Sequence, residues 1–148
     1  MSSVVPLLMA YSDQDLLNIS AYYASQTQTN GQAEDNAELL ALGEALYRSG
    51  NMKKAIPACT ACHSVNGSGN ALAGFPSVAG QQKAYLASTL KAYRSGERAA
   101  GDYALVMQAV SKNLSDDEID ALANYMHCLL YTSPSPRDQR GSRMPSSA

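Results

Sequence analysis

The residues best suited to chemistry lie in one short run, C-T-A-C-H, at positions 59–63. Cys59 and Cys62 are three residues apart, so both thiols fit on one turn and can reach the two vinyl groups of a single porphyrin. His63 follows directly and would lie beneath the iron as its proximal ligand. The C-x-x-C-H pattern is typical of covalent haem c attachment, and we predict one such haem here.

Two other kinds of site could use the same residues. A structural zinc site needs four ligands, and the only other candidates are His127 and Cys128, close to the C-terminal segment. A thioredoxin-like thiol pair expects a strand–helix–strand context, which this sequence lacks. With three cysteines in total, a closed disulfide framework is also disfavoured. Haem attachment remains the preferred interpretation.

The composition agrees with a buried cofactor. The chain has 148 residues but only one Phe and no Trp, so its core would be thin for this length unless a porphyrin supplied apolar volume. The formal net charge of −2 gives no indication of nucleic-acid binding. Neither a transmembrane span nor a secretory signal is visible in the sequence.

Apolar periodicity predicts an all-α chain. Helices are expected at about 12–25, 37–49, 81–95, 104–111 and 115–126. Ser12 and Ser115 are predicted N-caps, and Glu118 would complete a capping box with Ser115. Residues 51–80 contain the haem motif followed by a glycine-rich loop, and no segment has convincing strand alternation.

The predicted organisation has four parts. Segments 12–23 and 115–126 match in their serine cap, acids and apolar positions, so residues 1–25 are interpreted as the helical end of a preceding cytochrome domain. Two unrelated capped helices would give the same pattern. Residues 26–36 are expected to be a linker, and residues 37–130 the haem domain. Residues 131–148 are rich in Pro and Ser and predict disorder. Because the stretch from residue 128 resembles translated sequencing-adapter ends, this tail is expected not to be native.

Residues 42–126 resemble the class I cytochromes c, most closely the second domain of the two-haem cytochrome c4 group. The segments that carry the resemblance are Gly43–Tyr47, Ile56–His63, Phe75–Gln81, Tyr85–Leu86, Gly96–Arg98 and Leu114–Tyr125. The resemblance implies a fold of three to five helices around one covalent haem, with a second haem in the missing upstream domain. The chain departs from this group in three respects, which are the lost first haem site, a three-residue insertion after Leu8 and the unrelated tail.

The resemblance also implies roles for individual residues. Met107 would be the second axial ligand, although simple core filling would also explain it. The carbonyl of Pro76 would accept a hydrogen bond from the proximal histidine, and the alternative is an ordinary loop proline. Arg98 could neutralise a haem propionate, but most such arginines are only solvated. Gly43 and Tyr125 would let the first and last helices of the domain cross closely.

The function implied by the resemblance is electron transfer rather than enzymatic turnover. The chain would work in the bacterial periplasm, where haem is attached to this motif, so the missing signal peptide predicts a truncated start. Its expected partners are a quinol-oxidising complex and a terminal oxidase, with peripheral rather than transmembrane contact with the membrane. The alternative is a haem c module of a larger dehydrogenase or peroxidase-type enzyme. The sequence contains neither a second cofactor motif nor a distal acid–base pair to support it.

Overall fold

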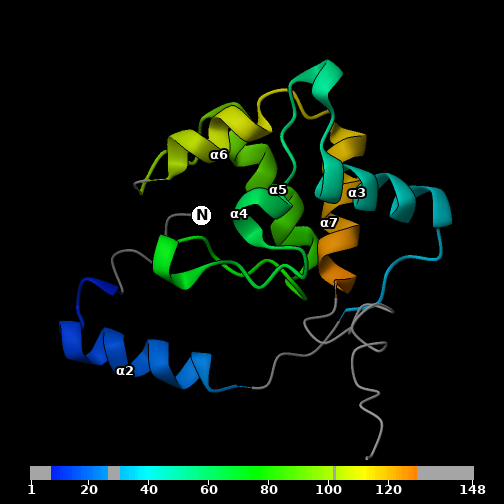
Figure 1. The fold of residues 1–148 in the computed structure, drawn as a ribbon. Helices are drawn as coiled ribbons and strands as arrows, with labels where there is room; N and C mark the ends of the chain where they lie inside the picture. Colours follow the sequence, from blue (N-terminus) through cyan, green and yellow to red (C-terminus); the bar gives the residue numbers. More distant parts are fainter. Residues whose placement is uncertain (1–7, 27–30, 102, 130–148) are drawn as a thin grey trace, which may run out of the picture.

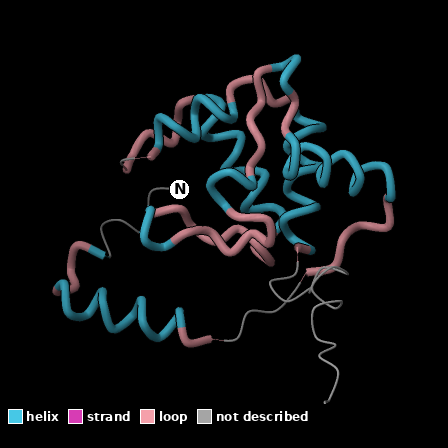
Figure 2. The backbone as a smooth tube through the Cα atoms, in the orientation of Figure 1, coloured by secondary structure: helices cyan, strands magenta, loops and turns pink. Residues whose placement is uncertain are grey.

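The computed structural model describes residues 8–26, 31–101 and 103–129. Within these ranges every named element is helical, and the only β-type contacts are two isolated bridges (Figures 1 and 2). The all-α prediction is confirmed. The predicted tail, residues 131–148, lies outside the described residues.

Helices α3 (Ala37–Ser49) and α7 (Asp116–Cys128) pack against each other and form the centre of the haem domain. Helix α3 has the predicted bounds and ends at Gly50, where φ is +66°. Helix α7 begins with the predicted capping box and continues two residues beyond the predicted end at residue 126. Burial raises the pKa of Glu118, but hydrogen bonds from Lys54 and Ser115 outweigh this and lower it.

The close crossing of α3 and α7 depends on one small residue. A Cβ added to Gly43 would overlap the backbone carbonyl of Ala121 and lie 2.8 Å from the Cβ of Tyr125. One turn further along α3, the rings of Tyr47 and Tyr125 lie 5.4 Å apart, centroid to centroid. The predicted close crossing at Gly43 and Tyr125 is therefore confirmed.

Helix α5 (Lys83–Ser95) packs against both α7 and α6 (Ala104–Ser111). It begins two residues later than predicted, whereas α6 has the predicted bounds. Helices α3, α5 and α7 contribute to one hydrophobic core. Its buried members are Leu46, Tyr47, Ile56, Leu86, Leu90, Leu114, Ile119, Leu122, Ala123, Tyr125 and Met126.

The region predicted as motif and loop contains three short helical elements. They are the 3₁₀ turns η1 (Met52–Lys54) and η2 (Ala71–Ala73) and the single α-helical turn α4 (Thr60–His63). In the view of Figure 1, α6 lies above α4 and the green segment containing η2 lies below it. In this view the turn with the haem motif lies between α6 and this segment.

Helix α2 (Asp13–Ala24) differs from the others because none of its residues is buried. Its N-terminus has a capping box formed by Ser12 and Asp15, the same arrangement that begins α7. The likeness of the two segments therefore extends from sequence to cap geometry. Tyr22 and Tyr23 on α2 are largely exposed.

Residues 31–36, predicted as part of a linker, contact the haem domain. The backbone N–H of Glu34 donates to the side-chain oxygen of Asn124, 3.0 Å away, and its carboxylate pairs with Lys83. Gly31 lies against the ring of His127 so closely that a Cβ would overlap the ring. In the part of the chain that the structure describes, no helix is long and apolar enough to cross a membrane.

Candidate haem site

Helix α4 brings the two motif thiols onto one turn. Cys59 is its N-cap residue, and the backbone N–H of His63 donates to the Cys59 carbonyl at 2.9 Å. Residues three apart on such a turn lie on the same side, so the thiols of Cys59 and Cys62 share one face. Both thiols are free and half-buried. This arrangement can present two sulfur atoms to one flat ligand.

Cys59 is the more enclosed of the two thiols. Its side chain packs against the hydrophobic core, and burial raises the pKa of the thiol to about 11. At neutral pH the Cys59 side chain is therefore a neutral thiol in apolar surroundings.

The tautomer of His63 follows from its hydrogen bond. Its Nδ1 lies 2.9 Å from the carbonyl oxygen of Pro76. A carbonyl can only accept, so Nδ1 carries the proton and Nε2 keeps its lone pair. This nitrogen, on the residue that ends the turn of the two cysteines, is the donor that a haem iron requires, and a fixed imidazole tautomer is typical of metal-ligating histidines.

A tight loop places the Pro76 carbonyl. Asn70 and Phe75 exchange two backbone hydrogen bonds of 2.9 and 3.0 Å, which close the loop around η2. Gly69, with φ of +72°, precedes it, and a Cβ there would lie 2.6 Å from the Pro76 oxygen. Glycine is therefore required for the close approach of backbone at this position.

The residue that follows His63 has an uncommon backbone conformation. Ser64 has φ of +63°, which few residues other than glycine adopt. The hydroxyl of the fully buried Tyr47 donates to the Ser64 carbonyl at 2.7 Å. In the sequence Tyr47 stands only as the end of a segment that carries the resemblance, so its contact beside the histidine is a finding of the structure.

Met107 lies in the middle of α6, on the face that turns inward. Ala104 and Ser111, one turn before and after it, are 3% and 0% exposed, and Met107 itself packs against the core. Among the other methionines that the structure describes, Met9 and Met52 are 82% and 86% exposed, and Met126 is buried within the core. Met107 is thus the half-buried methionine on a helix that flanks the haem motif.

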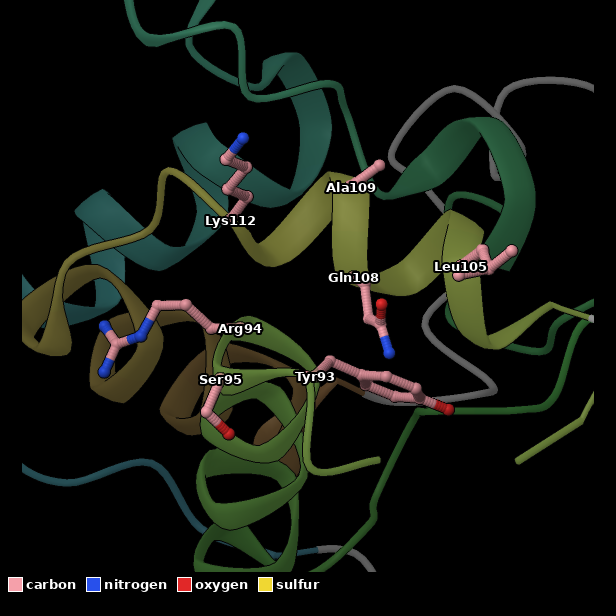
Figure 3. A pocket seen from close by; sticks show the side chains of 8 residues that line it. Tyr93, Arg94, Ser95, Leu105, Gln108, Ala109 and Lys112 are labelled. Atoms are coloured by element: carbon pink, nitrogen blue, oxygen red, sulfur yellow. The ribbon is translucent and has the colours of Figure 1, made fainter. Parts of the chain in front are cut away.

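The opposite face of α6 lines an open groove of about 340 Å³, formed with the end of α5. Figure 3 shows Tyr93 and Gln108 directed toward one another across it, whereas Lys112 and Arg94 extend away. Residues 105, 108, 109 and 112 lie about 100–200° around the helix from Met107. The groove is therefore separate from the haem site.

Apolar side chains around the donor residues fit a large flat ligand. Val65 follows the histidine by two residues, Leu72 lies in η2, and Val106 directly precedes the methionine; they are 59%, 102% and 47% exposed. A porphyrin ring is apolar over most of its surface, and exposed apolar groups on the segments that flank a donor set are typical of ligand sites. The residues present fit a haem.

Arg98 interacts with two tyrosines. Its guanidinium carbon lies 5.2 Å from the ring centroid of Tyr93, and hydrogen bonding to Tyr85 raises its pKa. The arginine is therefore held as a fixed cation at the end of α5. Contact with a propionate stays a prediction.

The zinc alternative finds no support in the structure. Within the described ranges no group of three or more His, Cys, Asp or Glu side chains could hold a metal ion. At the end of α7, the Nδ1 of His127 bonds to the Gln81 carbonyl and the thiol of Cys128 donates to the Tyr125 carbonyl. These two residues therefore do not complete a four-ligand set with the motif cysteines.

Comparison with known proteins identifies the family of the chain. A family model described as cytochrome c matches residues 40–129. Cytochrome c4 of Pseudomonas aeruginosa is 44% identical over 123 residues, which cover 83% of this chain and 60% of that protein. The chain spans between 58% and 65% of the length of four such cytochrome c4 relatives.

Solved structures agree with the sequence matches. The crystal structure of reduced recombinant cytochrome c4 from Pseudomonas stutzeri superposes with a TM-score of 0.81 at 40% identity, covering 88% of this chain and 67% of that chain. Thiosulfate dehydrogenase from Marichromatium purpuratum superposes with a TM-score of 0.76 at 31% identity, covering 99% and 31%. This chain has the class I cytochrome c fold with covalently bound haem c, and it belongs to the cytochrome c family.

Proposed function

We propose that the chain is an electron-transfer cytochrome whose haem is bound through Cys59 and Cys62 and ligated by His63 and Met107. The observation that carries the proposal is the Nδ1–H of His63 bonded to the Pro76 carbonyl, because it leaves Nε2 free beside two thiols. The iron would be held by two protein side chains, those of His63 and Met107. The chain would then carry electrons without binding a substrate.

Each residue has a distinct task in this scheme. The haem iron, when bound, supplies a one-electron couple. Cys59 and Cys62 would hold the ring to α4 through thioether bonds, each formed by adding its S–H across one vinyl group. The Pro76 carbonyl holds the imidazole of His63 in one orientation and raises its basicity. The thioether of Met107 would favour the ferrous state and so raise the reduction potential.

The proposal extends to the setting of the protein. We place it in the periplasm, with a quinol-oxidising complex as donor, a terminal oxidase as acceptor, and peripheral contact with the membrane. The cytochrome c4 relatives support this setting. A second haem in a preceding domain is supported by α2, whose capping box and apolar positions match those of α7. Arg98, held over Tyr93, would neutralise a haem propionate.

A second candidate function is a haem c module of a larger oxidoreductase. The likeness to thiosulfate dehydrogenase, which covers nearly the whole of this chain, favours it. The two functions differ in the sixth position of the iron. Rapid binding of carbon monoxide to the reduced purified protein, or of cyanide to the oxidised protein, would favour an enzymatic module. Slow binding of both would favour the electron carrier.

Substitution of Met107 tests the ligand assignment. Met107→Ala is expected to abolish the iron–sulfur absorption band of the ferric protein, to lower its reduction potential and to allow rapid cyanide binding. Two other methionines serve as controls. Met52→Ala changes an exposed side chain and should leave all three properties as they are. Met126→Ala should cost about 2–5 kcal/mol of stability as a core truncation but keep the band. An unchanged band in Met107→Ala would sink the assignment.

A further inference from the structure

Two segments of the haem domain form the same loop. The first loop, Gly50–Pro57, has the sequence G-N-M-K-K-A-I-P, and the second loop, Gly69–Pro76, has G-N-A-L-A-G-F-P. Both begin with Gly-Asn, contain a 3₁₀ turn and end in an apolar residue followed by proline. The two loops lie on either side of the haem motif in the sequence.

The likeness extends to backbone geometry. Asn51 and Ile56 exchange hydrogen bonds of 2.8 and 2.9 Å, as Asn70 and Phe75 do in the second loop. The two asparagines have nearly identical dihedral angles, φ of −142° and −144°, and each side chain accepts from the backbone N–H three residues later at 3.3 Å. The first loop is therefore a structural copy of the loop that places the Pro76 carbonyl.

The first loop holds the C-terminal end of α6. The side-chain amide of Asn113, two residues after the helix ends, donates to the Lys54 carbonyl at 2.9 Å. The ammonium of Lys54 also pairs with Glu118 at the start of α7, at 2.5 Å. The corner between α6 and α7 is thereby tied to the segment that leads into Cys59.

The second loop holds the N-terminal end of the same helix. Tyr103, the N-cap residue of α6, has its ring centroid 5.3 Å from that of Phe75 at an interplanar angle of 58°. A Cβ on Gly74 would lie 2.9 Å from the Tyr103 ring, so glycine admits this contact. Phe75 directly precedes Pro76, the partner of the histidine.

Helix α6 depends on such contacts because it is short. An isolated helix of eight residues is unstable in water, since too few hydrogen bonds form to offset nucleation. Tyr103 makes no side-chain capping hydrogen bond. The position of α6 is therefore determined by the groups that pack against it, and its two ends are held by the two loops.

We propose that the two loops act as paired clamps that position α6 and thereby set the strength of the bond between Met107 and the iron. The proposal rests on the proposed ligation by Met107, which lies one turn after Tyr103 and six residues before Asn113. Through Pro76 and Cys59 the same loops also hold the histidine side of the site. Tyr103 and Asn113 are thus positioning residues, and neither is a ligand.

The test uses the holoprotein and measures how readily the methionine leaves the iron. Cyanide binds the ferric protein only after Met107 dissociates, so its binding rate reports on this bond. Tyr103→Leu is expected to raise the rate about three- to tenfold, the range given by loss of an aromatic pair. Asn113→Ala is expected to raise it roughly fivefold, as loss of one hydrogen bond would. Both variants should weaken the iron–sulfur absorption band.

Matched variants separate positioning from general stability. Tyr103→Phe keeps the ring and should bind cyanide at the wild-type rate. Lys112→Ala, at the neighbouring and equally exposed position, leaves the bond from Asn113 to Lys54 in place and should do the same. The clamp is overturned if Tyr103→Leu and Asn113→Ala lower the denaturation midpoint yet bind cyanide at the wild-type rate. If the wild-type protein itself lacks the iron–sulfur band, the ligand assignment fails and the clamp fails with it.

Discussion

Tyr47 connects the helical core to the haem site through a single hydroxyl group. Its side chain is fully buried, and burial raises the pKa of the phenol well above its usual value, so it acts as a neutral donor. The acceptor is the carbonyl of Ser64, whose φ of +63° turns the chain away from the histidine. The ring contributes to the α3–α7 crossing and the hydroxyl to the loop, so the two contributions can be separated by substitution.

Tyr47→Phe keeps the ring and removes the hydrogen bond. The Ser64 carbonyl would lose its 2.7 Å bond and keep the 3.3 Å bond from the Gly67 backbone N–H, so the variant is expected to be less stable by about 0.5–1.5 kcal/mol. Urea unfolding of the holoprotein, followed by circular dichroism, measures this as a lower midpoint. Tyr22→Phe on α2, whose side chain is largely exposed, should unfold at the wild-type midpoint. An unshifted midpoint for Tyr47→Phe would mean that the hydroxyl contributes nothing to stability.

At the scale of elements, local patterns predicted the longer helices and failed in the segment between them. Helices α3 and α6 have their predicted bounds because apolar periodicity is encoded nearby in the sequence, and α3 also has a capping Asn36 and a terminal Gly50. The elements within residues 51–80 are too short to have a period, so they appeared only as motif and loop. The repeated Gly-Asn and closing Pro of the two loops were a signal in the sequence that could have revealed them.

The α3–α7 crossing allows a direct test at Gly43. Intrinsic helix propensity favours alanine over glycine by about 1 kcal/mol, so Gly43→Ala would stabilise an isolated α3. In the folded domain the added methyl would overlap the Ala121 carbonyl, which belongs to backbone and cannot rotate away. A net loss of about 1–3 kcal/mol is therefore expected.

Thermal or urea unfolding of the holoprotein measures the effect of Gly43→Ala. The control is Ser20→Ala on α2, a helix with no buried residue, where only the propensity applies and no loss is expected. Equal stability of Gly43→Ala and the wild type would show that the helices can separate to admit a methyl group at no cost.

At the scale of the molecule, the contacts that assemble the site are long-range. The motif and the helix with Met107 could be predicted because their residues are close in sequence. The contacts between Tyr47 and Ser64, Phe75 and Tyr103, and Lys54 and Asn113 join residues 17 to 59 positions apart. No local pattern specifies which of many tyrosines or asparagines meets which carbonyl, because that depends on how the helices pack.

Long-range contacts also separate two parts of the segment before residue 37. Helix α2 has no buried residue, whereas residues 31–36 contact the rest of the domain through Glu34. We predict that a variant beginning at Gly31 keeps the unfolding midpoint of the full chain, because α2 has no buried residue. A variant beginning at Ala37 also loses the backbone N–H of Glu34 that bonds to Asn124. Asn124 is 0% exposed, so leaving its oxygen without a donor should cost about 1–3 kcal/mol.

The control for this pair is Glu34→Ala in the full chain. It removes the ion pair with Lys83 but keeps the backbone donor, and a solvent-exposed ion pair contributes only about 0–1 kcal/mol. A small change in Glu34→Ala with a large loss in the Ala37 variant would therefore identify the backbone contact as the stabilising one. If the Gly31 variant is as unstable as the Ala37 variant, α2 itself stabilises the domain, and the folded unit begins earlier than Gly31.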